Sequence, residues 1–191
     1  MSGVEGISMS FEGFPVGGWR TRTVPVHRAA GRPAVLVVRS RGPLTSFTIT
    51  PVIDTPKVKR TGGYLLQTWG TSPHTFVLPG EYTHVEVARA GRESNGFARW
   101  HLDRIEVDEL RPLRGRVIGT GSEVFSWRGG EGRFRFDFTD KYRRNSFGFF
   151  SFEDGCEDRL ESDGNTRGTA TIPGPGFVRI QSPGTWTVNV V

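Results

Sequence analysis

Carboxylate side chains form the densest chemical feature of this sequence, in a short stretch of its C-terminal half. Six of them fall between residues 153 and 163, with Arg159 as the one basic residue among them. Hard cations such as Ca²⁺ take about six to eight oxygen ligands, and two aspartates on a preceding predicted hairpin could add oxygens. The candidate calcium ligands are Asp137, Asp140, Glu153, Asp154, Glu157, Asp158 and Asp163. The spacing fits no EF-hand loop, so a solvated acidic loop without metal is the competing interpretation.

Side chains suited to nucleophilic or acid–base catalysis are few. The four histidines all lie in the first half of the chain: His27, His74, His84 and His101. The single cysteine, Cys156, lies among carboxylates, whose negative charge raises a thiol pKa and so disfavours the thiolate nucleophile. No GxSxG, HExxH or P-loop pattern occurs. These features predict a protein that is not an enzyme and that needs no cofactor.

An aromatic stretch at residues 144–153 resembles the RNP1 strand of RNA-recognition motifs, in which phenylalanines stack on bases. In that interpretation Phe147 and Phe149 would lie on a sheet surface. The competing interpretation, a core strand, is favoured because no RNP2 strand appears and the following segment is acidic and loop-like. The charge also disfavours a nucleic-acid partner. The 22 Arg and 3 Lys exceed the 20 Asp and Glu by only 5, and neither half of the chain has a strong basic excess. Single-stranded nucleic-acid binding is therefore kept as a third hypothesis.

Tryptophans next to glycines are the remaining candidates for surface contacts. Trp19, Trp69 and Trp127 adjoin Gly18, Gly70 and Gly129. Such side chains can form contact platforms for sugars or proteins, or they can close the ends of a β-sandwich. Two arginines, Arg143 and Arg144, are further candidate contacts.

The elements that would position these residues are β-strands. Gly and Pro together make up 38 of the 191 residues, which disfavours long helices. Residues 132–138 (GRFRFDF) alternate polar and aromatic side chains, the period of a half-buried strand. Similar segments recur every 8–14 residues between turn signals, and no convincing amphipathic helix appears.

The order of these segments repeats once along the chain. Residues 31–37, 46–49, 75–80, 82–87 and 100–102 correspond in order to residues 132–138, 146–149, 169–174, 177–180 and 186–188. Pro79-Gly80 matches Pro173-Gly174, and each copy closes on a tryptophan strand, at Trp100 and at Trp186. The repeat predicts an internal duplication.

Together these patterns predict an all-β protein of two tandem antiparallel β-sandwich domains, jelly-roll-like and related by internal duplication. The expected domains are residues 1–110 and 114–191, with a short polar linker at 108–115 that contains Pro112. A linker of this length predicts domains that touch. A single closed barrel is less favoured because each copy ends with its own terminal strand.

The strand pattern of each copy resembles that of the small bacterial pre-peptidase C-terminal β-sandwich modules. In copy two the matching segments are Phe134-Arg135-Phe136, Pro173-Gly174 and Phe177-Val178-Arg179-Ile180; in copy one they are Val35, Val37, Pro79-Gly80 and Glu81-Tyr82. The Gly-x-Trp-x-Val ending and the lack of a secretion signal depart from that family. The resemblance implies an accessory binding or structural module without catalysis, and it implies no ligand.

The first expectation for function is thus a non-catalytic binding, adaptor or assembly module that acts through protein–protein contacts, with another protein or a second copy as partner. The calcium-binding module is the alternative. No apolar run of about 18 residues and no basic, apolar leader are present. The sequence therefore predicts a cytoplasmic protein without membrane insertion.

Overall fold

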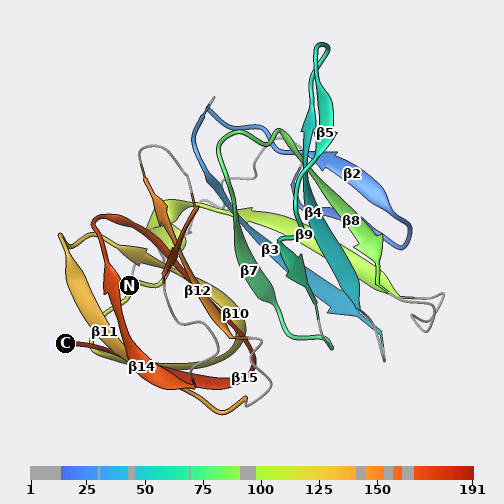
Figure 1. The fold of residues 1–191 in the computed structure, drawn as a ribbon. Helices are drawn as coiled ribbons and strands as arrows, with labels where there is room; N and C mark the ends of the chain where they lie inside the picture. The colour runs from blue at the N-terminus through green and yellow to red at the C-terminus, as the bar shows by residue number, and fades with distance from the viewer. Residues whose placement is uncertain are drawn as a thin grey trace, which may run out of the picture.

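The computed structural model is all-β and antiparallel, as the sequence predicts (Figure 1). It describes residues 14–29, 31–42, 46–68, 70–90, 98–140, 145–152, 157–160 and 166–191, and at 157–159 the backbone alone. Within these ranges the chain forms fifteen strands and one 3₁₀ turn, Val107–Glu109. None of the helical structure among these residues is long and apolar enough to cross a membrane.

The first half of the chain is a β-sandwich of two sheets. One sheet has the order β1 (Val16–Gly18), β9 (Arg99–Ile105), β3 (Ala34–Arg41), β7 (His74–Leu78). The other has the order β2 (Arg22–Pro25), β8 (His84–Arg89), β4 (Phe47–Asp54), β5 (Lys59–Thr61), with β6 (Leu66–Gln67) also paired to β4. Alternate residues of both sheets meet in one apolar core that includes Leu36, Phe47, Phe76, Val85 and Trp100, none more than 1% exposed. Period-two alternation produces this arrangement, because successive strand side chains point to opposite faces.

The second half forms a single sheet that folds over into two layers. Its strands are β10 (Arg116–Trp127), β11 (Gly132–Phe138), β12 (Ser146–Ser151), β13 (Glu157–Leu160), β14 (Arg167–Ile172) and β15 (Gly176–Val190). The first part of β15 pairs with β12 and its last part with β11, while β10 runs beside both parts. The two layers enclose a second core, in which the Phe134 and Phe147 rings lie 4.9 Å apart between centroids.

The bend between these layers lies at an irregularity in the β10–β15 pairing. The register shifts between Thr120 and Gly121, so that Pro183 and Gly184 on β15 have no opposite residue. Gly121 has a φ of 73°, a left-handed conformation that a residue with a side chain rarely adopts. A bulge of this kind bends the strand and lets it pass from one layer to the other.

Strand pairing in the two halves follows the same scheme. β3 pairs with β7 and β9, and β11 correspondingly pairs with β14 and the last part of β15. β4 pairs with β8, and β12 with the first part of β15. Even the register agrees: Val37 lies opposite Thr75 and Arg135 opposite Thr169, each threonine four residues before a Pro-Gly pair. This correspondence supports the internal duplication, which remains a prediction, as do the domain boundaries.

The same register corrects one detail of the repeat. Val35 and Val37 were expected to match the phenylalanines of β11, whereas the pairing makes Leu36 the counterpart of Phe134. Leu36 and Phe134 are both fully buried in their cores. The alternation along β3 was misjudged by one residue because this strand is apolar on both faces, which removes the period-two signal.

The two tryptophan strands are built alike. Trp100 lies opposite Gly18, and its indole Nε1 donates to the carbonyl oxygen of Arg20 at 3.1 Å. Trp186 lies opposite Gly119, and its Nε1 donates to the carbonyl oxygen of Gly121 at 3.2 Å. In both halves the indole covers the glycine, where a Cβ atom would come within 3 Å of the ring.

The halves are joined by a third buried apolar cluster. Its members are Val35, Val77, Leu110, Val124, Phe150 and Phe177. Hydrogen bonds between described residues cross the same boundary, among them Ser122 Oγ to the Thr75 carbonyl at 2.9 Å and Arg32 Nη1 to the Phe152 carbonyl at 3.0 Å. The segment expected as a linker is built into the structure, because Leu113 lies in the second core and its N–H donates to the Ser126 carbonyl at 3.0 Å. The halves are thus packed against each other.

Buried apolar residues of the cluster between the halves lie on outer strand faces that are polar at the corresponding positions elsewhere. The opposed pair Phe150–Phe177 has Thr50–Glu86 as its counterpart in the first half. On the other side of the boundary, the pairing makes Arg133 the counterpart of Val35, and Arg133 is exposed. At these counterpart positions the free faces are polar, as in the terminal units of repeat proteins, although Ile118 on β10 is an exposed apolar exception.

Candidate functional site

The structure brings few of the predicted calcium ligands together. The Asp137 carboxylate on β11 forms an ion pair with Arg167, Oδ2 to Nε, at 3.0 Å. Glu157 and Asp158 lie on β13, opposite Phe150 and Phe149, but their side chains lie outside the described residues. Glu153, Asp154 and Asp163 also lie outside them. Within the described part of the chain no three metal-ligating side chains form a group, so the calcium hypothesis stays a prediction.

The aromatic strand β12 packs into the second core. Phe147 is fully buried and Phe149 is 3% exposed. Both rings belong to the cluster between the two layers of the second half. The core interpretation of this strand is confirmed, since rings in this position offer no face to a base.

The two candidate contact tryptophans that lie within the described residues have different surroundings. Trp19, between β1 and β2, is 53% exposed, and the Arg99 guanidinium lies 5.5 Å from its ring centroid. Trp127 is half-buried over Gly129 and Gly132, and its Nε1 donates to the Gly130 carbonyl at 2.8 Å, so it covers one end of the second core. The other candidate contacts, Trp69, Arg143 and Arg144, lie outside the described residues.

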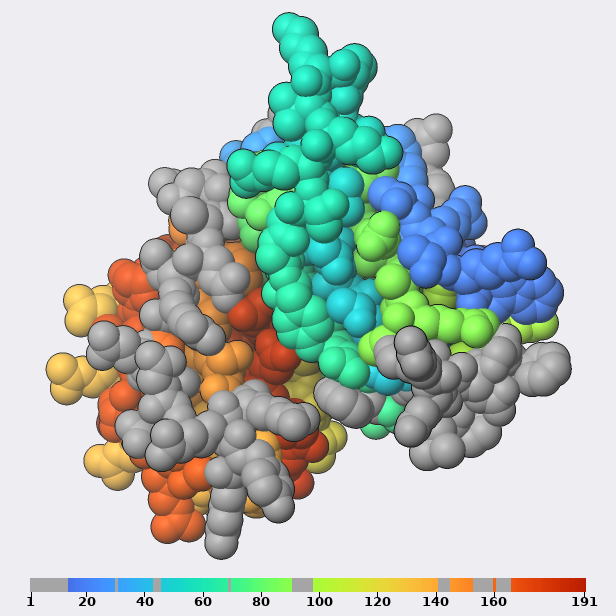
Figure 2. Space-filling model, turned by 45° about the vertical axis from the view of Figure 1, so that its right-hand side comes forward, coloured from blue at the N-terminus to red at the C-terminus, as the bar shows by residue number. Residues whose placement is uncertain are grey.

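The most prominent surface feature is a β-hairpin that projects from the first half. It comprises residues 52–61, the end of β4 and the whole of β5, and we call it the projecting hairpin. Figure 1 shows it extending beyond the ends of the neighbouring strands, and Figure 2 shows its tip standing clear of the rest of the surface. Every residue from Thr55 to Thr61 is exposed. Its two arms are paired as antiparallel strands, and Asp54 lies opposite Lys59 next to the turn.

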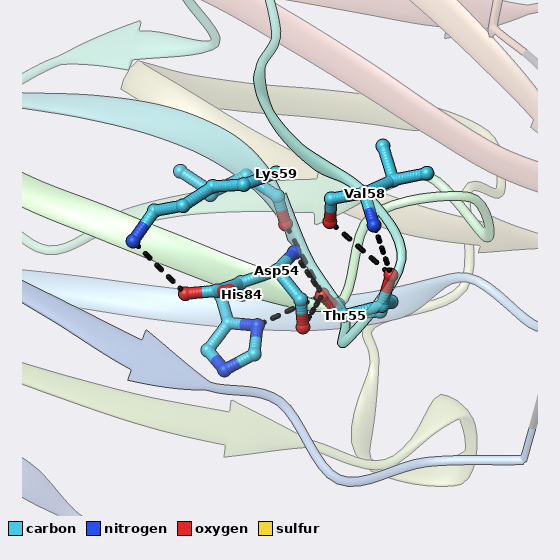
Figure 3. A network of polar contacts seen from close by, with 7 residues as sticks. Asp54, Thr55, Val58, Lys59 and His84 are labelled. Carbon is cyan, nitrogen blue, oxygen red and sulfur yellow. Dashed lines mark hydrogen bonds and ion pairs between the residues drawn. The ribbon is translucent and has the colours of Figure 1, made fainter.

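The tip of the projecting hairpin is held by hydrogen bonds between its own residues (Figure 3). Thr55 N–H donates to the Val58 carbonyl at 2.9 Å, and Thr55 Oγ1 accepts from Val58 N–H at 3.0 Å. Pro56 follows Thr55 in the turn, where its fixed φ is favourable. Lys59 Nζ lies 3.5 Å from Asp54 Oδ2, an exposed ion pair worth less than about 1 kcal/mol. The turn itself, more than the ion pair, defines the shape of the tip.

The base of the projecting hairpin is fastened to the loop before β8. Thr83 Oγ1 accepts from Asp54 N–H at 2.8 Å and lies 2.8 Å from Nδ1 of His84. Thr83 N–H donates to the Val52 carbonyl at 3.0 Å. The Tyr82 ring packs over Gly62, where a Cβ atom would come within 2.6 Å of it.

A partly buried arginine supports this loop from the other side. The Arg28 guanidinium donates to the carbonyls of Leu78, at 2.8 Å, of Pro79, at 2.6 Å, and of Tyr82. Burial and the nearby positive charge of Arg104 lower the Arg28 pKa to about 10. Arg28 therefore still carries its charge at neutral pH and fixes the loop that fastens the projecting hairpin.

The tip presents an apolar side chain between positive charges. Val58 is 49% exposed, and Lys57, Lys59 and Arg60 surround it in sequence. Two of the three lysines of the chain thus lie in one turn. Within the projecting hairpin Asp54 is the one opposing charge, which leaves a net charge of +2 over residues 52–61.

The projecting hairpin was not anticipated from the sequence. The segment 54–61 (DTPKVKRT) is polar and was not singled out among the candidate sites. Its two signals are the Thr-Pro pair between two strand-like segments and the clustering of scarce lysines. Neither signal predicts how far the hairpin extends beyond the body, since this depends on the lengths of the strands beside it.

We expect Thr83→Val to loosen the projecting hairpin while leaving the two cores intact. The substitution removes the hydroxyl that accepts from Asp54 N–H, and losing such a bond weakens local structure by about 1–3 kcal/mol. Hydrogen exchange at residues 54–60 should accelerate about tenfold or more. Thr171→Val, at an exposed threonine on β14, is the matched control. It should leave hydrogen exchange at residues 54–60 unchanged. Equal exchange in the two variants would show that Thr83 does not fasten the hairpin.

Comparisons with known proteins place this chain in no family. No protein-family model matches it, and no curated protein does. Among solved structures, a match was found to a "putative secreted protein from Eubacterium rectale" with 8% sequence identity and a TM-score of 0.23. The match covers 90% of this chain and 62% of the other chain. At this TM-score the likeness supports no statement about fold or activity.

The same comparison corrects the predicted location. The sequence led us to expect a cytoplasmic protein, whereas the matched protein is described as secreted. The cytoplasmic prediction is withdrawn on this description, and at this TM-score no other location is assigned to the chain.

Proposed function

We propose that this protein is a non-catalytic binding module that contacts another protein through the tip of the projecting hairpin. The observation that carries the proposal is the exposed Val58 on a turn that is fastened at both tip and base. A pre-formed turn loses little conformational entropy when it binds, so its contacts are available for affinity. Exposed apolar side chains on ordered, projecting segments are suited to insertion into a partner's pocket.

The chemistry of the tip indicates the kind of partner. Val58 requires a small apolar pocket, and the neighbouring Lys57, Lys59 and Arg60 require carboxylates around it. Two copies that met tip to tip would bring positive charges together, and like charges disfavour that contact. The partner proposed here is therefore a different protein with an acidic rim around an apolar pocket.

We expect reversal of the tip charge to abolish partner capture. Tagged full-length protein should be incubated with cells and culture medium of the source organism, and retained proteins quantified by mass spectrometry. The variant Lys57→Glu/Arg60→Glu should lose at least 90% of one specific partner, because close like charges cost several kcal/mol. The control Arg133→Glu/Arg135→Glu changes charge equally at exposed positions on β11 and should retain that partner. Loss from both variants, or from neither, would contradict a role for the tip.

A further inference from the structure

A cleft lies between the two halves of the protein, on the side where β6 faces the bend of β15. It has a volume of about 550 Å³, within the range of about 300–1,000 Å³ typical of small-molecule sites. The first half contributes β6, the start of β7 and the residues beside them; the second half contributes the β10 and β15 bulge. Figure 2 shows the segment around β6 lying alongside β15. Clefts between packed units are preferred positions for ligand sites.

The floor of the cleft combines three buried polar side chains with the buried Leu66. His74, Ser122 and Ser182 line it and are 4%, 4% and 2% exposed. Ser122 Oγ donates to the Thr75 carbonyl, so its oxygen can still accept a bond. Ser182 Oγ accepts from Gly184 N–H at 3.1 Å, so its O–H can still donate. The floor thus offers both hydrogen-bond donors and acceptors.

The rim adds an aromatic ring and further groups that both donate and accept. Tyr64 is 57% exposed, and Ser72 and Thr120 are also exposed. Gln67 and Gln181 lie between rim and floor, and the Gln67 amide is oriented by donating to Ser46 Oγ at 2.8 Å. Among the described residues that line the cleft, none is Asp, Glu, Lys or Arg.

From this lining we infer that the cleft binds a neutral saccharide. Sugar hydroxyls donate and accept at once, as do Ser, Thr, Tyr, Gln and His side chains. A pyranose ring also has an apolar C–H face that can lie against the Tyr64 ring. The described lining carries no charge, which disfavours phosphates, sulfates and amino acids, because burial of these groups calls for a countercharge. This site is separate from the projecting hairpin, and the inference does not depend on the proposed function.

The test uses the full-length protein and four neutral trisaccharides: cellotriose, maltotriose, mannotriose and triacetylchitotriose. Each is titrated to about 10 mM against ¹⁵N-labelled protein. We expect at least one to shift amide resonances of the lining residues, and of few others. Tyr64→Ala and Gln181→Ala should each weaken the binding of that trisaccharide at least tenfold. Ser72→Ala should weaken it at least threefold, and this substitution should disturb folding little because Ser72 is exposed. Val58→Ala at the hairpin tip should bind with unchanged affinity.

Two results would overturn the inference. One is the lack of cleft-centred shifts with all four trisaccharides at 10 mM. The other is binding that persists at full strength in both Tyr64→Ala and Ser72→Ala, verified as folded by their melting curves. Partner capture by the projecting hairpin is measured separately and would be unaffected by either result, so the two proposals fail independently.

Discussion

Phe177→Ala is expected to lower the free energy of unfolding by about 3–5 kcal/mol, since truncation of a buried phenylalanine removes both apolar burial and packing. Phe177 is 1% exposed in the cluster between the halves, where its ring meets the Phe152 ring edge-on at 4.8 Å. For a chain of this size such a loss lowers the melting temperature by roughly 6–20 °C. Thermal unfolding followed by circular dichroism measures it.

The matched control for Phe177 is its counterpart in the first half, Glu86. The two residues hold the same place in the pairing scheme, but Glu86 is half-buried at a free face. Glu86→Ala should change stability by no more than about 0.5 kcal/mol. A loss below about 1 kcal/mol for Phe177→Ala would show that the halves do not depend on this cluster.

Gly119→Ala is expected to destabilise the protein by about 3 kcal/mol or more. A Cβ atom at this position would lie 2.2 Å from Cζ2 of Trp186, which is itself buried, so the indole or the strand must move. At Gly18 the corresponding distance to Trp100 is 2.9 Å, and Gly18→Ala should cost less, about 1–3 kcal/mol. Urea unfolding of each variant gives the two values.

A double-mutant cycle attributes the effect of Gly119→Ala to the indole. In a Trp186→Phe background the smaller ring leaves room for the new methyl group, so the effect of Gly119→Ala should shrink by about 1–3 kcal/mol. Gly174→Ala, where a Cβ atom meets no atom within 4 Å, is the neutral control. An equal effect in both backgrounds would mean that contact with Trp186 is not the cause.

The sequence was informative wherever one face of a strand is buried. The alternation at Phe134, Phe136 and Phe138 predicted β11 and its core face correctly, and all three side chains are at most 5% exposed. The closing strands at Trp100 and Trp186 were found for the same reason. Local period-two patterning, which one strand carries within itself, is sufficient for such elements.

Features that depend on contacts between distant segments were not predicted. Val35 and Val77 are buried because the second half covers them, and no local pattern distinguishes this from core burial. The bend of β15 at Pro183 depends on a register shift against β10, more than 60 residues away in sequence. The candidate site was missed for a related reason: the residues of the projecting hairpin are polar, and their significance lies in their position beyond the sheet.

Photo-crosslinking from the hairpin tip tests the proposed function most directly. Val58 is replaced by p-benzoyl-phenylalanine in the full-length protein, which is irradiated in the presence of cells and medium of the source organism. We predict one adduct of discrete mass that contains a single partner protein. The same photoreactive residue at Thr185, an exposed position on β15, should give no such adduct. No adduct from position 58, or the same adducts from both positions, would contradict a protein-binding role for the projecting hairpin.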